Sequence, residues 1–395
     1  MSDEAIRASF IPLVDAAPLI VAKQRGFDRQ HGISLSLHKS ASWAALRDRL
    51  SVGLDQCAHM LAPIPIASQL GVGNPKARMV VPCGLSMNGN AISVSTDIYQ
   101  AMMDAGFAPG DARNPSKSAH ILAKVIQDRK EKGGQRLTLA SVYPISPHAY
   151  ELKYWLAYAG IDPQRDVNLT ILPPTQMLPA ISDGFIDGYC VGAPWNGLGE
   201  ESQVAKVVAT KADIWRQGPE KVLALREDWA SERQETVEKL VRMIIESAAW
   251  CSDPANFHDI AQILSDEEFL GIDSRIIKNS LLGKLPGLAR DGSDDYLIFD
   301  PKRVCEPRPE HALWFYAQMV RWGQVDYSAK MAEQAKNTYI TTYFSPSQVE
   351  ANDQSSEAEE NGVMSSRDGH LRLFDGVIFD ADDIPGYLAK FADTA

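Results

Sequence analysis

Strand-like and helix-like segments alternate over the first 61 residues, and this alternation constrains the fold more than any other feature of the chain. Apolar residues occupy every second position over residues 33–37, the pattern of a half-buried strand. The helix before this strand is predicted to start with Asp15 as N-cap, to carry Pro18 in its first turn and to end at Gly26. Units of this kind predict an α/β protein built on parallel sheets.

A second helix is predicted from Ser42, with Trp43 in its first turn and Gly53 at its end, before the strand-like run QCAHML. The order of helix end, glycine, aspartate, strand and Ala-Pro near residues 49–65 returns near residues 180–196. Two similarly built lobes would give such a repeat. Any helix, turn and strand with a glycine stop would give it too, so both interpretations stay open.

Size and charge limit the protein class. A chain of 395 residues exceeds what one hydrophobic core usually supports, so two domains are expected. The formal net charge is -12 and the basic residues are scattered, which argues against nucleic acid or a membrane as direct partner. Any anion site must therefore be a local exception to the acidic surface.

The cellular location is predicted from the N-terminus and the cysteines. The first residues, MSDEAIRASF, carry no visible secretory signal, and the chain has no apolar run long enough to cross a bilayer. The 5 cysteines are widely spaced without a CxxC pair, which predicts buried, reduced thiols and no structural metal site. We therefore expect a cytoplasmic protein.

The C-terminal part differs in composition from the rest. Residues 345–368 are polar, acidic and rich in serine, and they predict a disordered acidic linker. Residues 369–395 form a C-terminal extension with one alternating segment and one short amphipathic helix. This extension is expected to dock onto the body of the protein or onto a partner.

Seven runs of residues, in this order and spacing, resemble a known family: DAAPLIVAKQRGF, SASWAALRDRL, AHMLAPIPIAS, NGNAIS, LPPTQM, GYCVGAPWN and PEKVLALREDW. They look like the nitrate- and bicarbonate-binding proteins of ABC transporters (NrtA/CmpA-like), and in particular like the NasS-type nitrate and nitrite sensors. The resemblance covers about residues 8–340. It implies the type II periplasmic-binding-protein fold, with two α/β lobes, a ligand cleft and two crossover strands. Lobe I is then expected at 1–93 and 194–344, and lobe II at 94–193.

The resemblance also implies a nitrate site made of Trp43, Asn90, His148 and Lys221. Nitrate has three acceptor oxygens, so its site needs inward N–H donors and a cation, and these side chains supply both. Taken singly, each has a more ordinary explanation. The tryptophan suits core packing, the asparagine a turn, the histidine a satisfied core position and the lysine a solvated charge.

Three positions depart from the pattern of the family. Transport relatives generally carry glutamine where Asn90 stands, which moves the amide back by about one methylene. The bicarbonate branch carries an acidic group with calcium near the position of Lys221, so a lysine there opposes both a metal and bicarbonate as the ligand. Ala193 also stands where many transport relatives have glutamate, which removes a carboxylate from the cleft and favours a bare anion. No cofactor and no metal are therefore expected.

The first functional hypothesis is a nitrate/nitrite sensor whose partner, by resemblance, is an RNA-binding antitermination response regulator (NasT-like) released on ligand binding. The alternative is the substrate-binding component of an ABC-type importer of nitrate or a related anion. The chain has no HExxH, GxSxG or phosphate-loop motif, so an enzyme is not expected.

Overall fold

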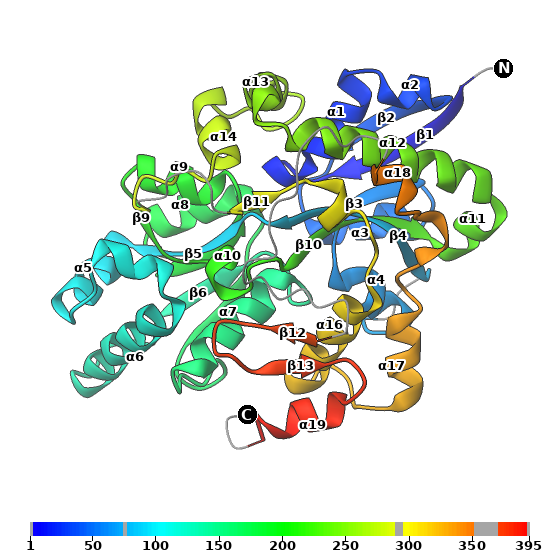
Figure 1. Cartoon of the computed structure of the whole chain (residues 1–395). Helices are drawn as coiled ribbons and strands as arrows, with labels where there is room; N and C mark the ends of the chain where they lie inside the picture. The colour runs from blue at the N-terminus through cyan, green and yellow to red at the C-terminus, as the bar shows by residue number, and fades with distance from the viewer. Residues whose placement is uncertain (1–2, 74–76, 289–294, 351–369, 393–395) are drawn as a thin grey trace.

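Two separate β-sheets, each covered by helices, form the body of the protein (Figure 1). The structure is a computed structural model, and it describes residues 3–73, 77–288, 295–350 and 370–392. Among these residues, the first sheet has 6 strands in the order β11-β4-β10-β3-β1-β2, and the second has 5 in the order β7-β6-β8-β5-β9. The predicted α/β architecture with two lobes is thus present.

The first sheet is built mostly from the N-terminal part of the chain. Its strands are β1 (Glu4–Phe10), β2 (Ile33–Lys39), β3 (Cys57–Leu61), β4 (Met79–Asn88), β10 (Pro219–Arg226) and β11 (Leu297–Ile298). β1 pairs in parallel with β2 and β3, so the alternating segment at 33–37 lies on an edge strand. β10 lies antiparallel between β3 and β4.

The second sheet is built from the middle of the chain. Its strands are β5 (Asn90–Ser95), β6 (Thr138–Ser141), β7 (Asn168–Ile171), β8 (Gly188–Gly192) and β9 (Ala205–Thr210). β6 is parallel to β7 and β8, whereas β5 runs antiparallel to β8 and β9. The proposed lobe boundaries stay a prediction, but β9 pairs within this second sheet although it follows residue 194.

The chain passes between the sheets twice, and both passages lead into an antiparallel strand. β4 ends at Asn88, Gly89 follows with a φ of 85°, and β5 begins at Asn90 in the other sheet. The return passage runs from β9 through α10 (Lys211–Ile214) into β10. Glycine adopts a positive φ at little steric cost, so Gly89 suits this turn. The side chain of Asn90 is therefore not needed to form the turn.

Helices cover both sheets. The helices of the first lobe are α1 (Ala17–Gln24), α2 (Phe27–Gln30), α3 (Trp43–Ser51), α4 (Pro63–Gln69), α11 (Glu227–Glu232), α12 (Gln234–Ser252), α13 (Phe257–Ser265), α14 (Ser274–Leu281), α15 (Pro301–Val304), α16 (Pro309–Arg321), α17 (Ala329–Lys336) and α18 (Ser347–Glu350). Those around the second sheet are α5 (Thr96–Asp104), α6 (Pro115–Glu131), α7 (Pro147–Tyr158), α8 (Met177–Ser182), α9 (Trp195–Glu201) and α10. Short 3-10 turns are η1 (Val14–Ala16), η2 (Pro109–Arg113), η3 (Pro174–Gln176), η4 (Pro254–Asn256) and η5 (Thr341–Tyr343).

Local signals explain where several helices begin. Ser42 caps α3 by accepting a hydrogen bond from the Ala45 N–H at 3.2 Å, as the sequence predicts. The cap role expected of Asp15 is wrong, because this residue lies inside η1 and makes no side-chain cap. Its carboxylate is instead turned inward. The repeat noted near residues 49–65 and 180–196 corresponds to β3 followed by α4 and to β8 followed by α9, one pair in each lobe.

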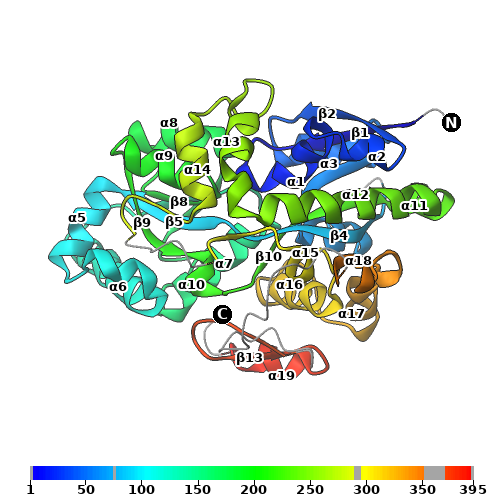
Figure 2. The ribbon, with the colours of Figure 1, turned by 45° about the horizontal axis from the view of Figure 1, so that its top comes forward.

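The C-terminal unit, residues 370–392, packs on the body of the protein. Docking onto the body was one of the two expected arrangements, the other being docking onto a partner. The unit consists of the hairpin β12 (His370–Arg372) and β13 (Ile378–Asp380) and of α19 (Ile384–Ala389). It lies beside α16 in both orientations shown (Figures 1 and 2). Tyr154 of α7 donates to Asp375 at 2.7 Å, and Gln318 of α16 donates to Tyr387 at 3.1 Å. The predicted disordered linker at 345–368 lies mostly outside the described residues.

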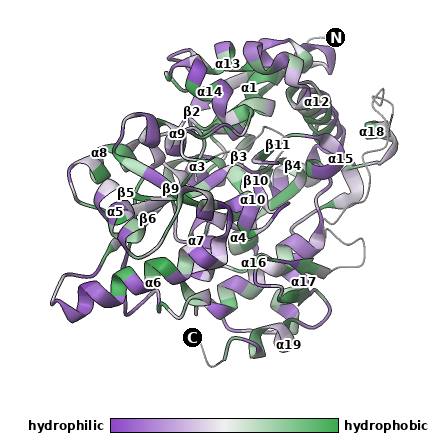
Figure 3. Ribbon diagram, turned by 60° about the vertical axis from the view of Figure 1, so that its left-hand side comes forward, coloured by the Kyte–Doolittle hydropathy of each residue, from purple (hydrophilic) through white to green (hydrophobic). Residues whose placement is uncertain are grey.

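Most buried apolar side chains form one large core cluster, and Met87, Ile298 and Val304 form a second, small one. α6 illustrates how an amphipathic helix packs on the large core cluster: hydrophobic and hydrophilic residues alternate along its ribbon, and its buried residues lie on one face (Figure 3). All 5 cysteines are buried and free, which confirms their interpretation as buried thiols. Among the helices of the described residues, none combines the length and apolarity needed to cross a membrane.

Candidate functional site

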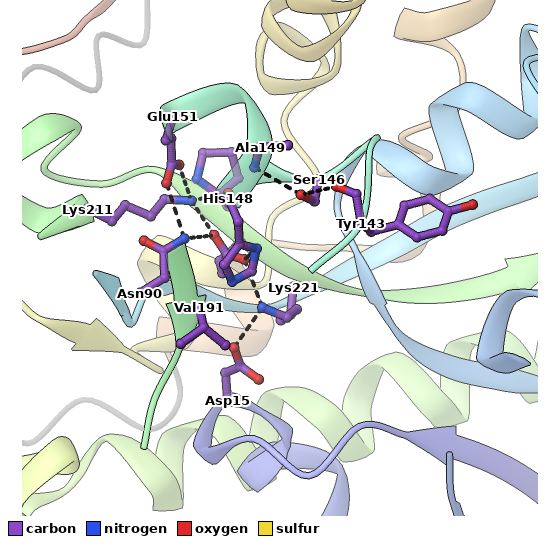
Figure 4. A network of polar contacts seen from close by, with 12 residues as sticks. Asp15, Asn90, Tyr143, Ser146, His148, Ala149, Glu151, Val191, Lys211 and Lys221 are labelled. Carbon is purple, nitrogen blue, oxygen red and sulfur yellow. Dashed lines mark hydrogen bonds and ion pairs between the residues drawn. The ribbon is translucent and has the colours of Figure 1, made fainter. Parts of the chain in front are cut away.

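A cluster of buried polar side chains lies where the two crossovers meet the lobes (Figure 4). We call it the buried cluster and define it by its members: Asp15, Trp43, His59, Asn90, His148, Glu151, Lys211, Glu220 and Lys221. Each is at most 2% exposed. Ionised side chains are rarely buried unless they are paired, so their concentration at the lobe junction needs a physical explanation.

Glu220 and Lys221 lie at the start of β10, directly after the return passage. Neighbouring residues of a regular strand point to opposite faces of the sheet. Here the pairing of β10 with β4 is irregular between Pro219 and Val222, and such irregularities redirect side chains. The Lys221 Nζ consequently lies 2.8 Å from the Glu220 Oε1, and both groups enter the same cluster.

Lys221 forms a second ion pair within the first lobe. Its Nζ lies 2.8 Å from the Asp15 Oδ2, and the other oxygen of this carboxylate lies 2.9 Å from the His59 Nε2. The Trp43 ring lies 5.5 Å from the Lys221 Nζ and packs against His59 with ring centroids 5.6 Å apart. A cation over an aromatic face is stabilised further when it is desolvated. The Lys221 ammonium is thus held by η1, α3 and β10 together.

Lys211 holds the other side of the cluster. Its Nζ lies 2.7 Å from the Glu151 Oε1 and 2.5 Å from the Glu220 Oε2, and it donates to the Pro219 carbonyl at 2.8 Å. Asn90 donates from the same Nδ2 to Glu151 at 3.1 Å and to Glu220 at 3.0 Å. Two carboxylates therefore share one ammonium group and one amide.

In the buried cluster, the His59 Nδ1 has no hydrogen bond to the described residues, although the His59 Nε2 contacts Asp15. Two further rings of the cluster make no hydrogen bond to the described residues with any ring nitrogen. They are the indole Nε1 of Trp43 and the imidazole of His148, whose Nδ1 lies 3.3 Å from the Glu220 Oε1 without forming a good hydrogen bond. A buried polar group without a partner costs about 1–3 kcal/mol. His148 also lies in the first turn of α7, where Ser146 is the N-cap and the helix dipole favours negative charge. These groups are the free donors that an anion would require.

The electrostatics differ among the three carboxylates. Burial raises the pKa of Glu220, but Lys211 and Lys221 outweigh it and bring the pKa to about 2. Burial also raises the pKa of Asp15, while Lys221 and His59 more than offset it and hold the pKa below its ordinary value. Both groups therefore stay ionised at neutral pH.

Glu151 behaves in the opposite way. Burial raises its pKa, Lys211 opposes this shift, and the nearby charge of Glu220 adds to it, so that the pKa reaches about 7. Burial lowers the pKa of His148 to about 3 and also lowers that of His59, so both imidazoles are neutral. Glu151 is thus the carboxylate of the cluster whose charge changes near neutral pH.

The structure brings together all four residues that the sequence singled out. Asn90, His148 and Lys221 converge on Glu220, and the Trp43 ring covers Lys221. Their role as ligand-binding residues remains a prediction. Sequence reasoning missed the residues that tie them together: Asp15, His59, Glu151, Lys211 and Glu220. A signal existed for two of these, since Glu220 precedes Lys221 directly and Glu151 lies one helical turn after His148.

The lobes also touch at the edge of this junction. Arg47, one turn after Trp43 on α3, donates to the Tyr143 hydroxyl of the second lobe at 2.6 Å. A pocket of about 250 Å³ lies beside this contact, between α3, α4 and the segment before α7. The pocket is separate from the buried cluster, because none of its lining residues belongs to the cluster. Among the described residues, no group of three or more His, Cys, Asp or Glu side chains is arranged to hold a metal ion.

Comparison with known proteins gives a family and several relatives. The sequence model of the NMT1-like family matches residues 2–265. The bicarbonate transport ATP-binding protein CmpC of Synechococcus elongatus is 32% identical over 97% of this chain, and the chain spans about half, 54%, of that relative. The nitrate/nitrite binding protein NrtA of the same species is 29% identical over 98% of this chain and 85% of the relative.

A solved structure agrees with the fold. The periplasmic nitrate-binding protein NrtA from Synechocystis PCC 6803 superimposes with a TM-score of 0.84 and 24% identity, covering 98% of both chains. The expected periplasmic-binding-protein fold is therefore confirmed. The expectation of a cytoplasmic location is wrong, because these relatives include a periplasmic binding protein and conflict with a cytoplasmic assignment. An N-terminus without a visible signal was too weak an observation to carry that expectation.

The relatives also bear on the functional hypotheses. The two NrtA relatives are named as nitrate or nitrate/nitrite binding proteins, which agrees with a non-enzymatic protein. A sensor specificity and an antitermination partner find no support among them. On the match over residues 2–265, the chain belongs to the NMT1-like family, and within it the chain resembles the nitrate- and bicarbonate-binding proteins.

Proposed function

We propose that this protein binds nitrate or nitrite between its lobes and serves as the substrate-binding component of an ABC-type importer. The observation that carries the proposal is the convergence of Asn90, His148 and Lys221 on the buried Glu220 carboxylate, with the Trp43 ring over Lys221. The rings of Trp43 and His148 are without hydrogen-bond partners among the described residues. The naming of relatives as nitrate/nitrite binding proteins supports the choice of ligand.

The chemistry of the donors supports a small flat oxyanion. The Trp43 indole offers one N–H, and His148 offers another in the matching tautomer. Lys221 supplies a positive charge that burial and its two ion pairs keep in place, since Asp15 and Glu220 raise its pKa against the effect of burial. The start of α7 adds a partial positive charge. Together these groups provide directional donors for three oxygens.

The position of the cluster supports a role in lobe closure. Asn90 begins the strand after one crossover, and Lys221 lies just after the other, whereas Trp43 and His148 belong to opposite lobes. A ligand held by all four would contact both lobes and both hinge strands. Its binding would stabilise the closed form by its differential affinity for the two forms.

The sensor hypothesis depended on a cytoplasmic location, so the importer takes its place as the favoured function. Ligand-dependent release of an antitermination response regulator stays a prediction from resemblance.

Isothermal titration at pH 6.5 with nitrate, nitrite, bicarbonate, sulfate and chloride tests the ligand. We expect one nitrate or nitrite per chain, and binding that is about tenfold to 150-fold weaker in Lys221→Met. Lys239→Met serves as a control, because Lys239 is partly exposed on α12, outside the buried cluster, and pairs with Glu235 one turn away on the same helix. Strongest binding of sulfate, or no anion binding at all, would overturn the proposal.

The importer role needs its own test. Cells lacking this protein should lose nitrate uptake at low external nitrate, and the wild-type chain should restore it while Lys221→Met does not. Unchanged uptake in cells that lack the protein, and in which no second binding protein is expressed, would refute the role in transport.

A further inference from the structure

The charges of the buried cluster do not suit a bare anion when all of its groups are ionised. Three carboxylates, those of Asp15, Glu151 and Glu220, face two ammonium groups, those of Lys211 and Lys221. The fully ionised cluster therefore carries one net negative charge. Entry of a monovalent anion would double this charge in a site closed to water.

The other titratable groups that face the cluster do not compensate. Burial lowers the pKa of His59, His148 and His311, so these rings are neutral. Burial raises the pKa of the Cys190 thiol on β8, which keeps it protonated. Uncompensated buried charge is strongly unfavourable, and buried groups change protonation state to avoid it.

The three carboxylates are not equally well compensated. Glu220 contacts both lysines, and Asp15 contacts Lys221 together with His59. Glu151 contacts one ammonium group, that of Lys211, and shares it and the Asn90 amide with Glu220. Two carboxylates that share their partners favour protonation of the less compensated one.

We infer that the site binds a monovalent oxyanion such as nitrate only with a proton on the carboxylate of Glu151, and that the site takes up this proton on binding wherever the free protein lacks it. The inference rests on the proposed function as an anion-binding protein and specifies how the anion is accepted. The proton comes from solvent and binds a carboxylate oxygen, so the cluster with its anion carries one net negative charge. A protonated Glu151 also becomes a hydrogen-bond donor.

The raised pKa of Glu151, about 7, makes this exchange measurable near neutral pH. Below this value the free protein already holds the proton, so binding takes up little. Above it, each bound anion must draw a proton from solution. Uptake should approach about 0.1 proton per nitrate at pH 6 and about 0.9 at pH 8, and affinity should fall about fivefold from pH 7 to pH 8.

Titration calorimetry with nitrate, in two amine buffers of different ionisation enthalpy at pH 6 and pH 8, measures this number directly. Glu151→Gln keeps the shape of the side chain but cannot ionise, so its nitrate affinity should no longer change with pH. Glu310→Gln is the matched control. Burial raises the pKa of Glu310 too, but this residue lies on α16 outside the cluster, so its variant should keep the proton uptake of the wild type.

The outcomes separate the inference from the function on which it rests. Nitrate binding at pH 8 without proton uptake overturns the inference and leaves the proposed function intact. Full proton uptake by Glu151→Gln overturns the assignment to this residue. Absence of nitrate binding at every pH overturns both. The wild-type measurement is decisive even if Glu151→Gln does not fold.

Discussion

Replacing Lys221 by methionine removes the ammonium group and leaves most of the side-chain volume. The Lys221 Nζ lies 2.8 Å from both the Asp15 and the Glu220 carboxylates, and all three groups are buried. Breaking a buried pair by removing one partner costs about 3–5 kcal/mol, because a buried charge is left uncompensated. Asp15 keeps His59 and Glu220 keeps Lys211, so we expect the lower part of this range.

The same substitution should weaken nitrate binding. A hydrogen bond to a charged group contributes about 1.5–3 kcal/mol, so the affinity should fall by about tenfold to 150-fold. Urea unfolding gives the loss of stability and titration calorimetry gives the loss of affinity. The double variant Asp15→Asn/Lys221→Met should recover part of the stability but not the affinity. A loss below about 1 kcal/mol with unchanged nitrate binding would refute the reasoning.

Three further predictions follow from other parts of the structure. Trp43→Phe keeps an aromatic ring but lacks the indole N–H, so the nitrate affinity should fall about fivefold to tenfold. The stability measured by urea unfolding should change little. An unchanged nitrate affinity would show that the indole N–H does not bind the anion. The folded pKa of Glu151 is about 7, above its ordinary value of 4.5, so its stabilising effect is complete below pH 4.5 and is lost as pH rises toward 7. The unfolding free energy of the wild type should therefore fall relative to Glu151→Gln by up to about 1.4 kcal/mol per pH unit between pH 5 and 7, and parallel pH profiles would contradict this. Phe379 is fully buried in the C-terminal unit against Tyr387, so Phe379→Ala should destabilise this unit by about 3–5 kcal/mol and speed its limited proteolysis; unchanged proteolysis would show that the packing does not hold the unit.

Local patterns in the sequence predicted much of the fold. The alternation around β2, the cap at Ser42 and the early Trp43 of α3 depend on neighbouring residues alone, and the structure contains all three. The repeat of strand, Ala-Pro and helix corresponds to equivalent places in two sheets. The role of Asp15 was misread because its partners, His59 and Lys221, lie far along the chain.

The charges of the cluster were harder to predict for a structural reason. Adjacent Glu220 and Lys221 should face opposite sides of a regular strand, and only the irregular pairing of β10 brings both inward. Lys211 begins a four-residue helix of sequence KADI, and nothing local indicates that its side chain is buried. The sequence therefore predicted nitrogen-bearing side chains that lie together in the structure, but not the carboxylates that surround them.

The location of bound nitrate tests the central claim most directly. A crystal structure of the protein grown with nitrate at pH 6.5 should show a flat three-oxygen ligand among Trp43, Asn90, His148 and Lys221, with the indole and imidazole N–H groups directed at it. Nitrate found elsewhere, or these four side chains unchanged and without a ligand at saturating nitrate, would contradict the account.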